Sequence, residues 1–224
     1  MTRIVAGSAR GRRLRVPPGQ ATRPTADRVR EALFSSLEST LGGFSGVRML
    51  DLYAGSGAVG LEALSRGATH VTFVESAARA VRTIRANVTT VGLPGTSIVH
   101  DRVERWLAAG RTPRAAEAPD TSATDAAAAS SATSRTADDL QRRSVDRGHP
   151  VDLVVADPPY ALTTGEMENI LALLVRGWLA PDALVVVERD RRSEPIEWPA
   201  GLTGLRERAY GETVLWYGRS AGTE

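Results

Sequence analysis

The sequence predicts an α/β fold in which helices cover a mostly parallel sheet. Short apolar runs of strand length, at residues 47–52, 71–74, 151–156 and 183–187, alternate with longer segments whose apolar residues recur at helical spacing. Strands that alternate with helices in this way form parallel βαβ units. A chain of 224 residues that is 42% hydrophobic is long enough to bury one substantial core of this kind.

A small β-hairpin is expected before the first helix. Gly7 and Gly11 lie between the apolar pair Ile4-Val5 and Leu14, a spacing that predicts two short strands and a turn. We therefore divide the chain into an extension, residues 1–24, and a main domain that follows it.

The extension is also strongly basic. Residues 1–30 hold eight arginines against one acid, Asp27, although the whole chain carries a net charge of only +2. Clustered arginines neutralise the phosphates of nucleic acids without reading their sequence. The charge pattern therefore predicts a phosphate-binding segment, with Arg3, Arg10, Arg12 and Arg13 as candidate contacts.

The remaining elements follow in a regular order. A first helix starts near Thr25 and carries Val29, Leu33 and Leu37 at intervals of four residues. The other segments with helical spacing lie at 77–91, 103–109 and 165–178, and two final strands, at 205–210 and 213–217, surround the turn residue Gly211.

A glycine-rich turn after the first main strand is the first candidate site. Residues 53–60 contain Gly55, Gly57 and Gly60, and they connect a strand to a helix. Glycines there let the backbone approach a ligand closely, and the helix N-terminus offers free N–H groups. The spacing also satisfies the weak dinucleotide pattern Gly-x-Gly-x-x-Gly, so a nicotinamide oxidoreductase stays an alternative.

Acidic residues at three successive strand ends favour a different cofactor, S-adenosylmethionine. Asp51 suits its cationic amino acid part, Glu75 can accept both ribose hydroxyls, and Asp101 can face the adenine amine. Ligands of such sheets bind at the carboxyl ends of the strands. The candidate cofactor-binding residues are Asp51, Tyr53, Ala54, Gly55, Ser56, Gly57, Glu75, Ser76, Asp101 and Arg102.

The most informative motif is Asp157-Pro158-Pro159-Tyr160, which follows the apolar run 151–156 directly. Two prolines lack N–H groups, so the carbonyls near them can point into a cleft rather than pair with a strand. A planar exocyclic amine fits between Asp157 and such a carbonyl, and Tyr160 offers a flat face for an extruded base. These four residues are the candidate catalytic residues of an amine methyltransferase that acts on nucleic acid.

Taken in this order, the motifs resemble those of the RsmD family of bacterial 16S rRNA methyltransferases. The resemblance covers nearly the whole chain, and its specific segments are residues 3–14, 23–34, 51–67 and 157–160. It implies the seven-stranded Rossmann-like fold of S-adenosylmethionine-dependent methyltransferases. It also implies methylation of N2 of one guanine, position 966 of 16S rRNA, in the small ribosomal subunit. Arg23 and Arg28 join the RNA-binding candidates on this basis.

Besides the nicotinamide oxidoreductase, two further alternatives to this function remain open at the level of the residues. An adenine-N6 methyltransferase of DNA or RNA would use the same tetrapeptide and cofactor. A non-catalytic RNA-binding assembly factor would keep the donor site without turnover.

One segment departs from the regular pattern and from the family. Of the 39 residues 111–149, 20 are Ala, Ser or Thr, which cannot bury enough apolar surface to offset their ordering entropy. We expect a disordered surface insert that interrupts the methyltransferase domain, residues 25–224. The absence of cysteine and of a long apolar run predicts no metal, no membrane and a cytoplasmic location, and we expect a monomer.

Overall fold

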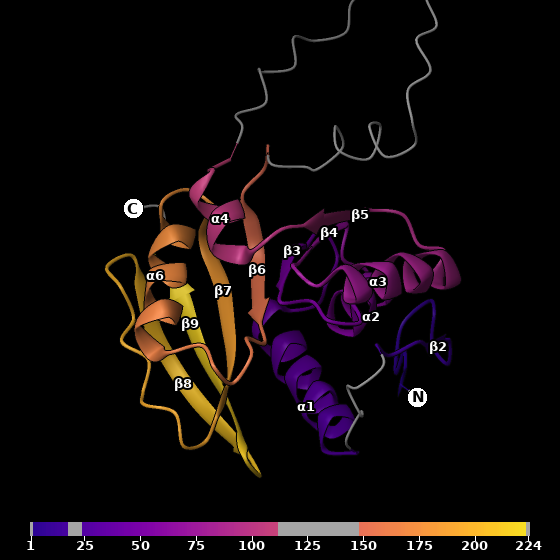
Figure 1. The fold of residues 1–224 in the computed structure, drawn as a ribbon, viewed down its shortest axis with the longest axis horizontal. Helices are drawn as coiled ribbons and strands as arrows, with labels where there is room; N and C mark the ends of the chain where they lie inside the picture. Colours follow the sequence, from indigo (N-terminus) through magenta and orange to yellow (C-terminus); the bar gives the residue numbers. More distant parts are fainter. Residues whose placement is uncertain (1, 18–23, 112–147, 223–224) are drawn as a thin grey trace, which may run out of the picture.

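The computed structural model describes residues 2–17, 24–111 and 148–222. Within them a two-stranded hairpin lies beside a seven-stranded sheet of order β5-β4-β3-β6-β7-β9-β8 (Figure 1). The strands are β1 (Thr2–Arg3), β2 (Arg13–Leu14), β3 (Arg48–Leu52), β4 (His70–Glu75), β5 (Thr96–His100), β6 (Val151–Ala156), β7 (Leu179–Asp190), β8 (Leu202–Tyr210) and β9 (Thr213–Ser220). Strands β5, β4, β3, β6 and β7 are parallel, and β9 is antiparallel to both β7 and β8.

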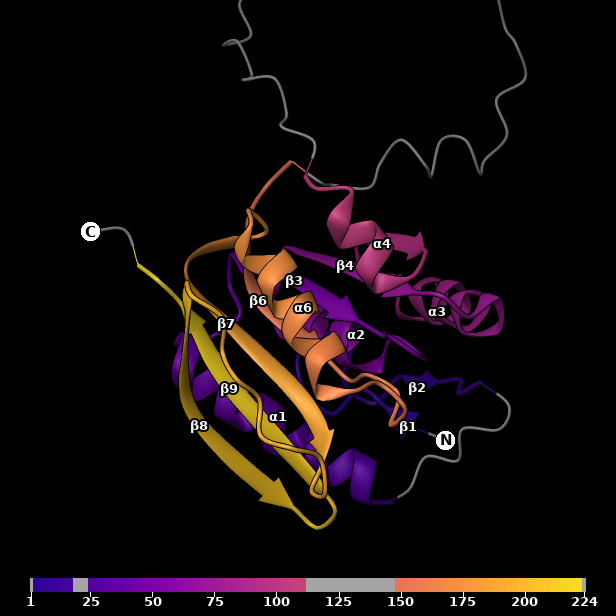
Figure 2. The ribbon, with the colours of Figure 1, turned by 60° about the vertical axis from the view of Figure 1, so that its left-hand side comes forward.

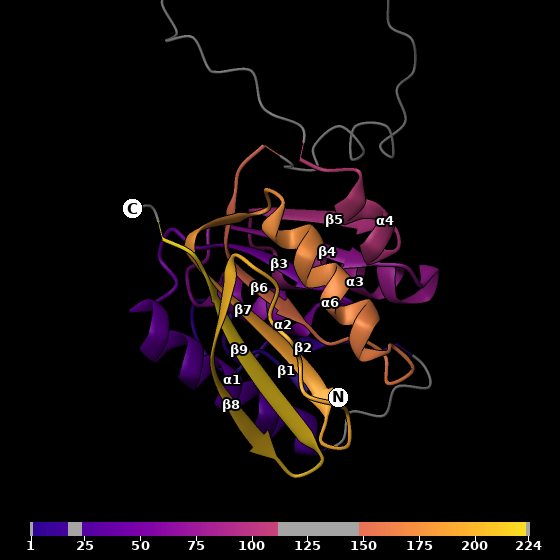
Figure 3. The same cartoon turned by 90° about the vertical axis from the view of Figure 1, so that its left-hand side faces the viewer.

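Helices cover both faces of the sheet. They are α1 (Pro24–Leu41), α2 (Ala58–Ser65), α3 (Ala78–Val91), α4 (Val103–Ala108) and α6 (Thr164–Val175). On one face, α1, α2 and α3 bury Phe34, Leu61 and Ile84 in one apolar cluster. On the other face, α4 and α6 bury Trp106 and Ile170 in a second cluster. Figures 2 and 3 show α6 in front of the sheet and α1 behind it.

The parallel register brings the carboxyl ends of four strands to one edge. Leu52 at the end of β3 pairs with Val74 of β4 and with Ala156 of β6, and Ala156 pairs in turn with Val187 of β7. The chain order reverses at β3, which lies between β4 and β6. Ligands of open α/β sheets bind at such a reversal, so this edge is where a site is expected.

The N-terminal hairpin is confirmed, and it is attached to α2. The buried carboxylate of Glu62 accepts the backbone N–H groups of Val5 and Ala6 at 2.7 and 2.9 Å. The hydroxyl of Ser65 accepts the N–H of Ala9 at 2.9 Å. These bonds attach the hairpin to the C-terminal half of α2.

Most expected elements are present, with changed limits near β7. The helix predicted at 165–178 ends at Val175, and β7 begins at Leu179, four residues before the predicted strand. The register of β6 and β7 shifts between Val151 and Leu153, so the first residues of β7 pair with β6 in a different register from the rest of the strand. The insert predicted at 111–149 lies, except for its ends, outside the described residues.

Candidate functional site

The glycine-rich turn after β3 has the backbone conformation that its sequence predicts. Tyr53, Gly55 and Gly57 all have positive φ angles, of 59°, 56° and 75°. Gly57 donates its N–H to the carbonyl of Ala54 at 2.7 Å, and Ala54 donates to Val74 of β4 at 3.2 Å. The turn is therefore closed on itself and tied to the neighbouring strand.

Asp51, in β3 just before this turn, binds the backbone of α2 just after it. It is buried, and its Oδ2 accepts the N–H of Gly60 at 2.9 Å. Burial raises the pKa of Asp51 to about 8, against the lowering effect of the Gly60 bond, and the nearby carboxylates Asp157 and Glu75 raise it further. Ionising Asp51 alone is therefore costly, and a cationic group bound beside it would favour its charged form.

Glu75, at the end of β4, holds the other side of the turn. Its Oε2 accepts the N–H of Gly55 at 2.9 Å, and its Oε1 accepts the N–H of Ala77 at 2.7 Å. A carboxylate has about four lone-pair positions, so two remain for ribose hydroxyls. The free acceptor positions of Glu75 thus fit the cofactor role predicted for it.

Asp101 follows β5, beyond β4 along the same edge of the sheet. Oδ1 of Asp101 accepts the N–H of Arg102 and the Nε of Arg105, both at 2.6 Å. The side-chain ring of His100 donates to the carbonyl of Ser76 at 3.1 Å. The hydroxyl of Tyr53 donates to Glu104 at 2.9 Å, and burial together with this bond raises the pKa of Tyr53.

The motif Asp157–Tyr160 forms the floor and rim of an open pocket at the same edge. The N–H of Asp157 reaches the carbonyl of Leu52 at 3.4 Å, and the carbonyl of Pro159 accepts the N–H of Leu162 at 2.9 Å. Tyr160 is 80% exposed, as a stacking face requires. The pocket is lined by Asp157, Pro158, Pro159, Tyr160, Glu188, Arg189, Asp190, Ser193 and Thr213.

Three pocket residues at the end of β7, Glu188, Arg189 and Asp190, were not among the predicted site residues. Glu188 lies beside Asp157, and the guanidinium of Arg189 donates to the carbonyl of Leu162 and to the hydroxyl of Thr164, at 3.1 and 3.3 Å. Arg189 is buried, so it fixes the loop that follows Asp157–Tyr160. The available signal was a glutamate and an arginine directly after an unbroken apolar run.

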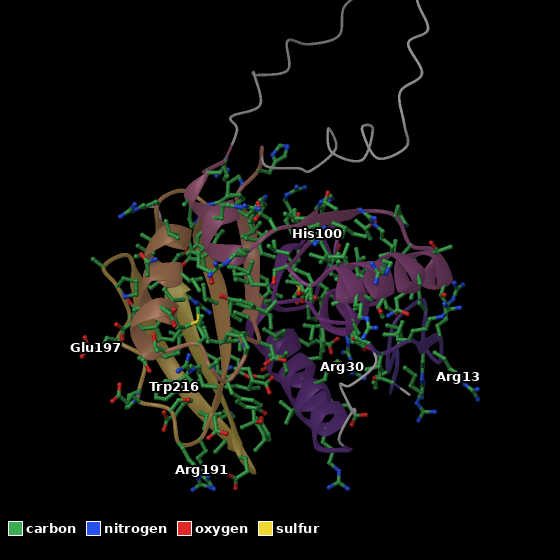
Figure 4. The ribbon with its side chains drawn as sticks, in the orientation of Figure 1. Arg13, Arg30, His100, Arg191, Glu197 and Trp216 are labelled. Carbon is green, nitrogen blue, oxygen red and sulfur yellow. The ribbon has the colours of Figure 1, made fainter. Side chains whose placement is uncertain are left out.

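The basic residues of the extension differ in what they contact. Arg3, Arg10, Arg13 and Arg28 are exposed. Arg12 instead donates its Nη1 to the carbonyls of Thr90 and Val91, at 2.8 and 2.6 Å, at the C-terminal end of α3. Figure 4 shows Arg13 directed outward from the hairpin, and Arg191 directed outward at the opposite end of the molecule. Arg23 lies outside the described residues.

The described part of the chain contains neither a candidate metal site nor a helix that could span a membrane. Its His, Asp and Glu residues form no group of three that could hold a metal ion. None of its helices is long and apolar enough to cross a membrane.

A parallel sheet in which β9 alone is reversed, a glycine-rich turn after β3 and an acid at the end of β4 define a class, the S-adenosylmethionine-dependent methyltransferases. A sequence model of the family described as "Conserved hypothetical protein 95" matches residues 2–118 and 118–219. The chain therefore belongs to this family, the RsmD family of rRNA methyltransferases.

Individual relatives agree over nearly the whole length. Ribosomal RNA small subunit methyltransferase D of Escherichia coli (strain K12) is 31% identical over 213 residues, which are 95% of this chain and 86% of that protein. "Putative rRNA methyltransferase YlbH" of Bacillus subtilis (strain 168) is 32% identical over 94% of this chain and 95% of its own. The solved structure titled "Putative methyltransferase yhhF from Escherichia coli" matches at a TM-score of 0.73 and 28% identity, covering 99% of this chain and 98% of that one.

The predicted seven-stranded methyltransferase fold is thus confirmed. The prediction of S-adenosylmethionine as cofactor is confirmed as well, since the chain belongs to a family of rRNA methyltransferases and has their fold.

Proposed function

We propose that this protein methylates the exocyclic N2 amine of one guanine of 16S rRNA, position 966, in the small ribosomal subunit. The observation that carries the proposal is the pocket at the end of β6, where a carboxylate, a proline-rich backbone and an exposed aromatic ring meet. Its distance from the cofactor turn is short, because β6 and β3 are neighbours in register. Family membership supports rRNA as the substrate.

The glycine-rich turn, Asp51, Glu75 and Asp101 would hold the methyl donor. When bound, S-adenosylmethionine supplies an electrophilic methyl group on a sulfonium. The turn offers backbone N–H groups and positive-φ glycines that permit close approach, and Glu75 keeps acceptor positions open. The donor set therefore fits this ligand.

Asp157 and the carbonyl of Pro158 would hold the target amine. Two acceptors on the amine hydrogens favour a pyramidal nitrogen, whose lone pair can then be directed at the methyl carbon. Tyr160 would stack on the extruded base, since an aromatic face is worth about 1–3 kcal/mol per base. Positioning of this kind can supply about 7–11 kcal/mol of the barrier reduction.

The exposed arginines of the hairpin, together with Arg28, would contact rRNA phosphates and set the register of the substrate. We further expect a monomer that acts in the cytoplasm without a metal.

Product analysis tests the proposal. The purified protein is incubated with labelled methyl donor and, separately, small subunits, free 16S rRNA and DNA, and the products are digested to nucleosides. We expect N2-methylguanosine, formed at one position, in the small-subunit reaction. N6-methyladenosine would overturn the guanine assignment and favour the adenine alternative, and no transfer to any substrate would favour an assembly factor.

A further inference from the structure

Asp157 and Glu188 are neighbouring carboxylates at the ends of two adjacent parallel strands. Ala156 of β6 pairs with Val187 of β7, so the residues that follow them lie side by side on the same face of the sheet. Both carboxylates line the pocket that also contains Pro158 and Tyr160. A base that reaches Asp157 in this pocket therefore also reaches Glu188.

The surroundings of Glu188 supply little hydrogen bonding for a negative charge. The hydroxyl of Thr213 on β9 reaches Glu188 at 3.5 Å, at the long limit for a hydrogen bond. Arg189 on the same strand directs its guanidinium to Leu162 and Thr164. On the same strand, Asp190 accepts the N–H of Arg192.

Further charged groups on this side of the sheet come from β3, β4, β8 and α1. The charges of Asp157 and of Glu75 on β4 raise the pKa of Asp51 on β3. Arg206 on β8 lies over the ring of Tyr217 and donates to the hydroxyls of Ser36 and Thr40 on α1. On α1, Arg30 is buried and donates to the carbonyl of Arg3, and Arg28 is exposed.

Two carboxylates in one pocket cannot both ionise without cost. Burial, and then repulsion from Asp157, raises the pKa of Glu188 to about 8, whereas burial raises that of Asp157 to about 6. The pKa values of the two carboxylates therefore differ. Such a difference is typical of sites where one carboxylate binds and the other exchanges a proton.

We propose that Glu188 is a second catalytic carboxylate, which faces the target amine beside Asp157 and accepts the proton that the amine loses on methylation. This inference rests on the proposed amine methylation but not on which nucleobase carries the amine. Asp157, which ionises first, holds the amine, and Glu188 acts as the base.

The amine nitrogen forms a bond to the methyl carbon, while the carbon–sulfur bond breaks and its electron pair stays on sulfur. The nitrogen is then cationic and carries two hydrogens. One of them passes as a proton to the Glu188 carboxylate, which leaves a neutral methylated amine and a protonated Glu188. The proton leaves through the open mouth of the pocket.

Glu188 suits this step better than Asp157 does. A general base is efficient when its pKa lies near the working pH, a condition that both carboxylates meet at neutral pH, so the strength with which each holds the proton decides between them. A base of pKa about 8 holds the transferred proton more firmly at neutral pH than one of about 6.

The variant Glu188→Gln tests the proposal, with the exposed Glu194→Gln as a matched control that removes a carboxylate outside the pocket. We expect Glu188→Gln to lower the single-turnover rate at least about 100-fold, with unchanged affinity for the methyl donor. In the wild type, kcat/KM for small subunits should rise with pH until it levels near the pKa of Glu188, about 8. This rise between pH 7 and 9 should be absent from Glu188→Gln and retained in Glu194→Gln.

A second readout needs no activity. Because the folded pKa of Glu188 lies above that of an unfolded glutamate, the wild type loses stability as pH rises through about 8. Glu188→Gln lacks this loss, so its melting temperature should increase relative to the wild type between pH 6 and 9.

Wild-type turnover in Glu188→Gln would overturn the proposal, and so would a slow variant that keeps the wild-type pH profile, since that result indicates a structural role. Nucleoside analysis of the wild-type product separates these outcomes from a failure of the guanine assignment, which would change the base and leave the effect of Glu188→Gln in place.

Discussion

Asn87 donates its side-chain amide to the carbonyl oxygen of Ser56 at 2.9 Å, and so joins α3 to the glycine-rich turn. The same amide donates to the carbonyl of Arg15 at 2.9 Å, and its Oδ1 accepts the Arg15 N–H at 2.8 Å. One fully buried side chain therefore connects the exit of the basic hairpin to the proposed methyl-donor site.

The substitution Asn87→Ala should weaken both parts. Three hydrogen bonds are lost and backbone groups of Arg15 and Ser56 are left without partners, so the free energy of unfolding should fall by about 1–3 kcal/mol. The Kd of the methyl donor should rise, because the turn at Ser56 loses its support. Chemical denaturation and equilibrium binding measure the two effects. Thr89→Ala, an exposed position on the same helix, is the control, and it should leave donor affinity unchanged and should not lower the free energy of unfolding. Unchanged donor affinity in Asn87→Ala would show that the turn holds its shape without this link.

Gly60 is expected to tolerate no side chain. A Cβ at this position would lie 2.4 Å from the ring of Phe73 and 2.6 Å from Val71, and both of those side chains are fully buried. Gly60→Ala should therefore lower the free energy of unfolding by about 1–3 kcal/mol, even though alanine favours helices. Gly165→Ala on α6, where a Cβ would meet nothing within 4 Å, should instead raise it by about 0.5–1 kcal/mol. Equal effects of the two substitutions in denaturation experiments would contradict the packing argument.

Asp157 should be needed for transfer and not for donor binding. Asp157→Asn keeps the shape of the side chain but removes the charge that orients the amine, so the single-turnover rate should fall at least about 100-fold. Calorimetry should give an unchanged Kd for the methyl donor. Asp182→Asn is the matched control, because Asp182 is exposed and has a φ of 60°, a conformation that asparagine adopts readily. Near wild-type transfer in Asp157→Asn would remove Asp157 from the proposed mechanism.

The order of the elements was predictable because each parallel strand and its helix carry their own local pattern. The apolar run 151–156 and the spacing of Val81, Ile84 and Val88 record burial directly. The start of β7 was not predictable in this way, because Pro181 and Asp182 interrupt the apolar pattern while the backbone still pairs with β6 at Val151.

The site residues also differ in whether a local sequence pattern predicts them. The glycine-rich turn and Asp157–Tyr160 are contiguous in sequence and were predicted as motifs. Glu188 and Asn87 depend on residues brought near only by folding, Asp157 and Ser56, respectively. The direction of Arg12 toward α3 likewise cannot be inferred from a run of like charges, since charge alone does not say which arginine packs.

Replacing residues 115–146 with a short Gly-Ser linker should leave the protein stable and active. Two described residues on either side of the segment are close, because Arg111 donates to the carbonyl of Gly148 at 3.0 Å. After Gly148 the chain enters β6 at Val151, and Asp157 lies at the other end of that strand, about 20 Å away. Loop closure depends weakly on length, at about 0.6 kcal/mol per doubling. Thermal melting and transfer assays should therefore match the wild type, and a large drop in either would show that the segment contributes to folding or to RNA binding.

Arg10 and Arg13 should bind rRNA phosphates, whereas Arg12 should stabilise the hairpin. The double variant Arg10→Ala/Arg13→Ala should raise KM for small subunits and reduce the slope of log KM against log salt by about 1.5, if each contacts one phosphate. Arg12→Ala should instead lower the free energy of unfolding by about 1–3 kcal/mol, because two carbonyls at the end of α3 lose a charged donor. The modified nucleoside should be the same in all three proteins, since phosphate contacts do not read sequence. An unchanged salt slope in the double variant would move the RNA-binding surface away from the hairpin, toward Arg28 and the exposed Arg191 and Arg192 that follow β7 beside the pocket.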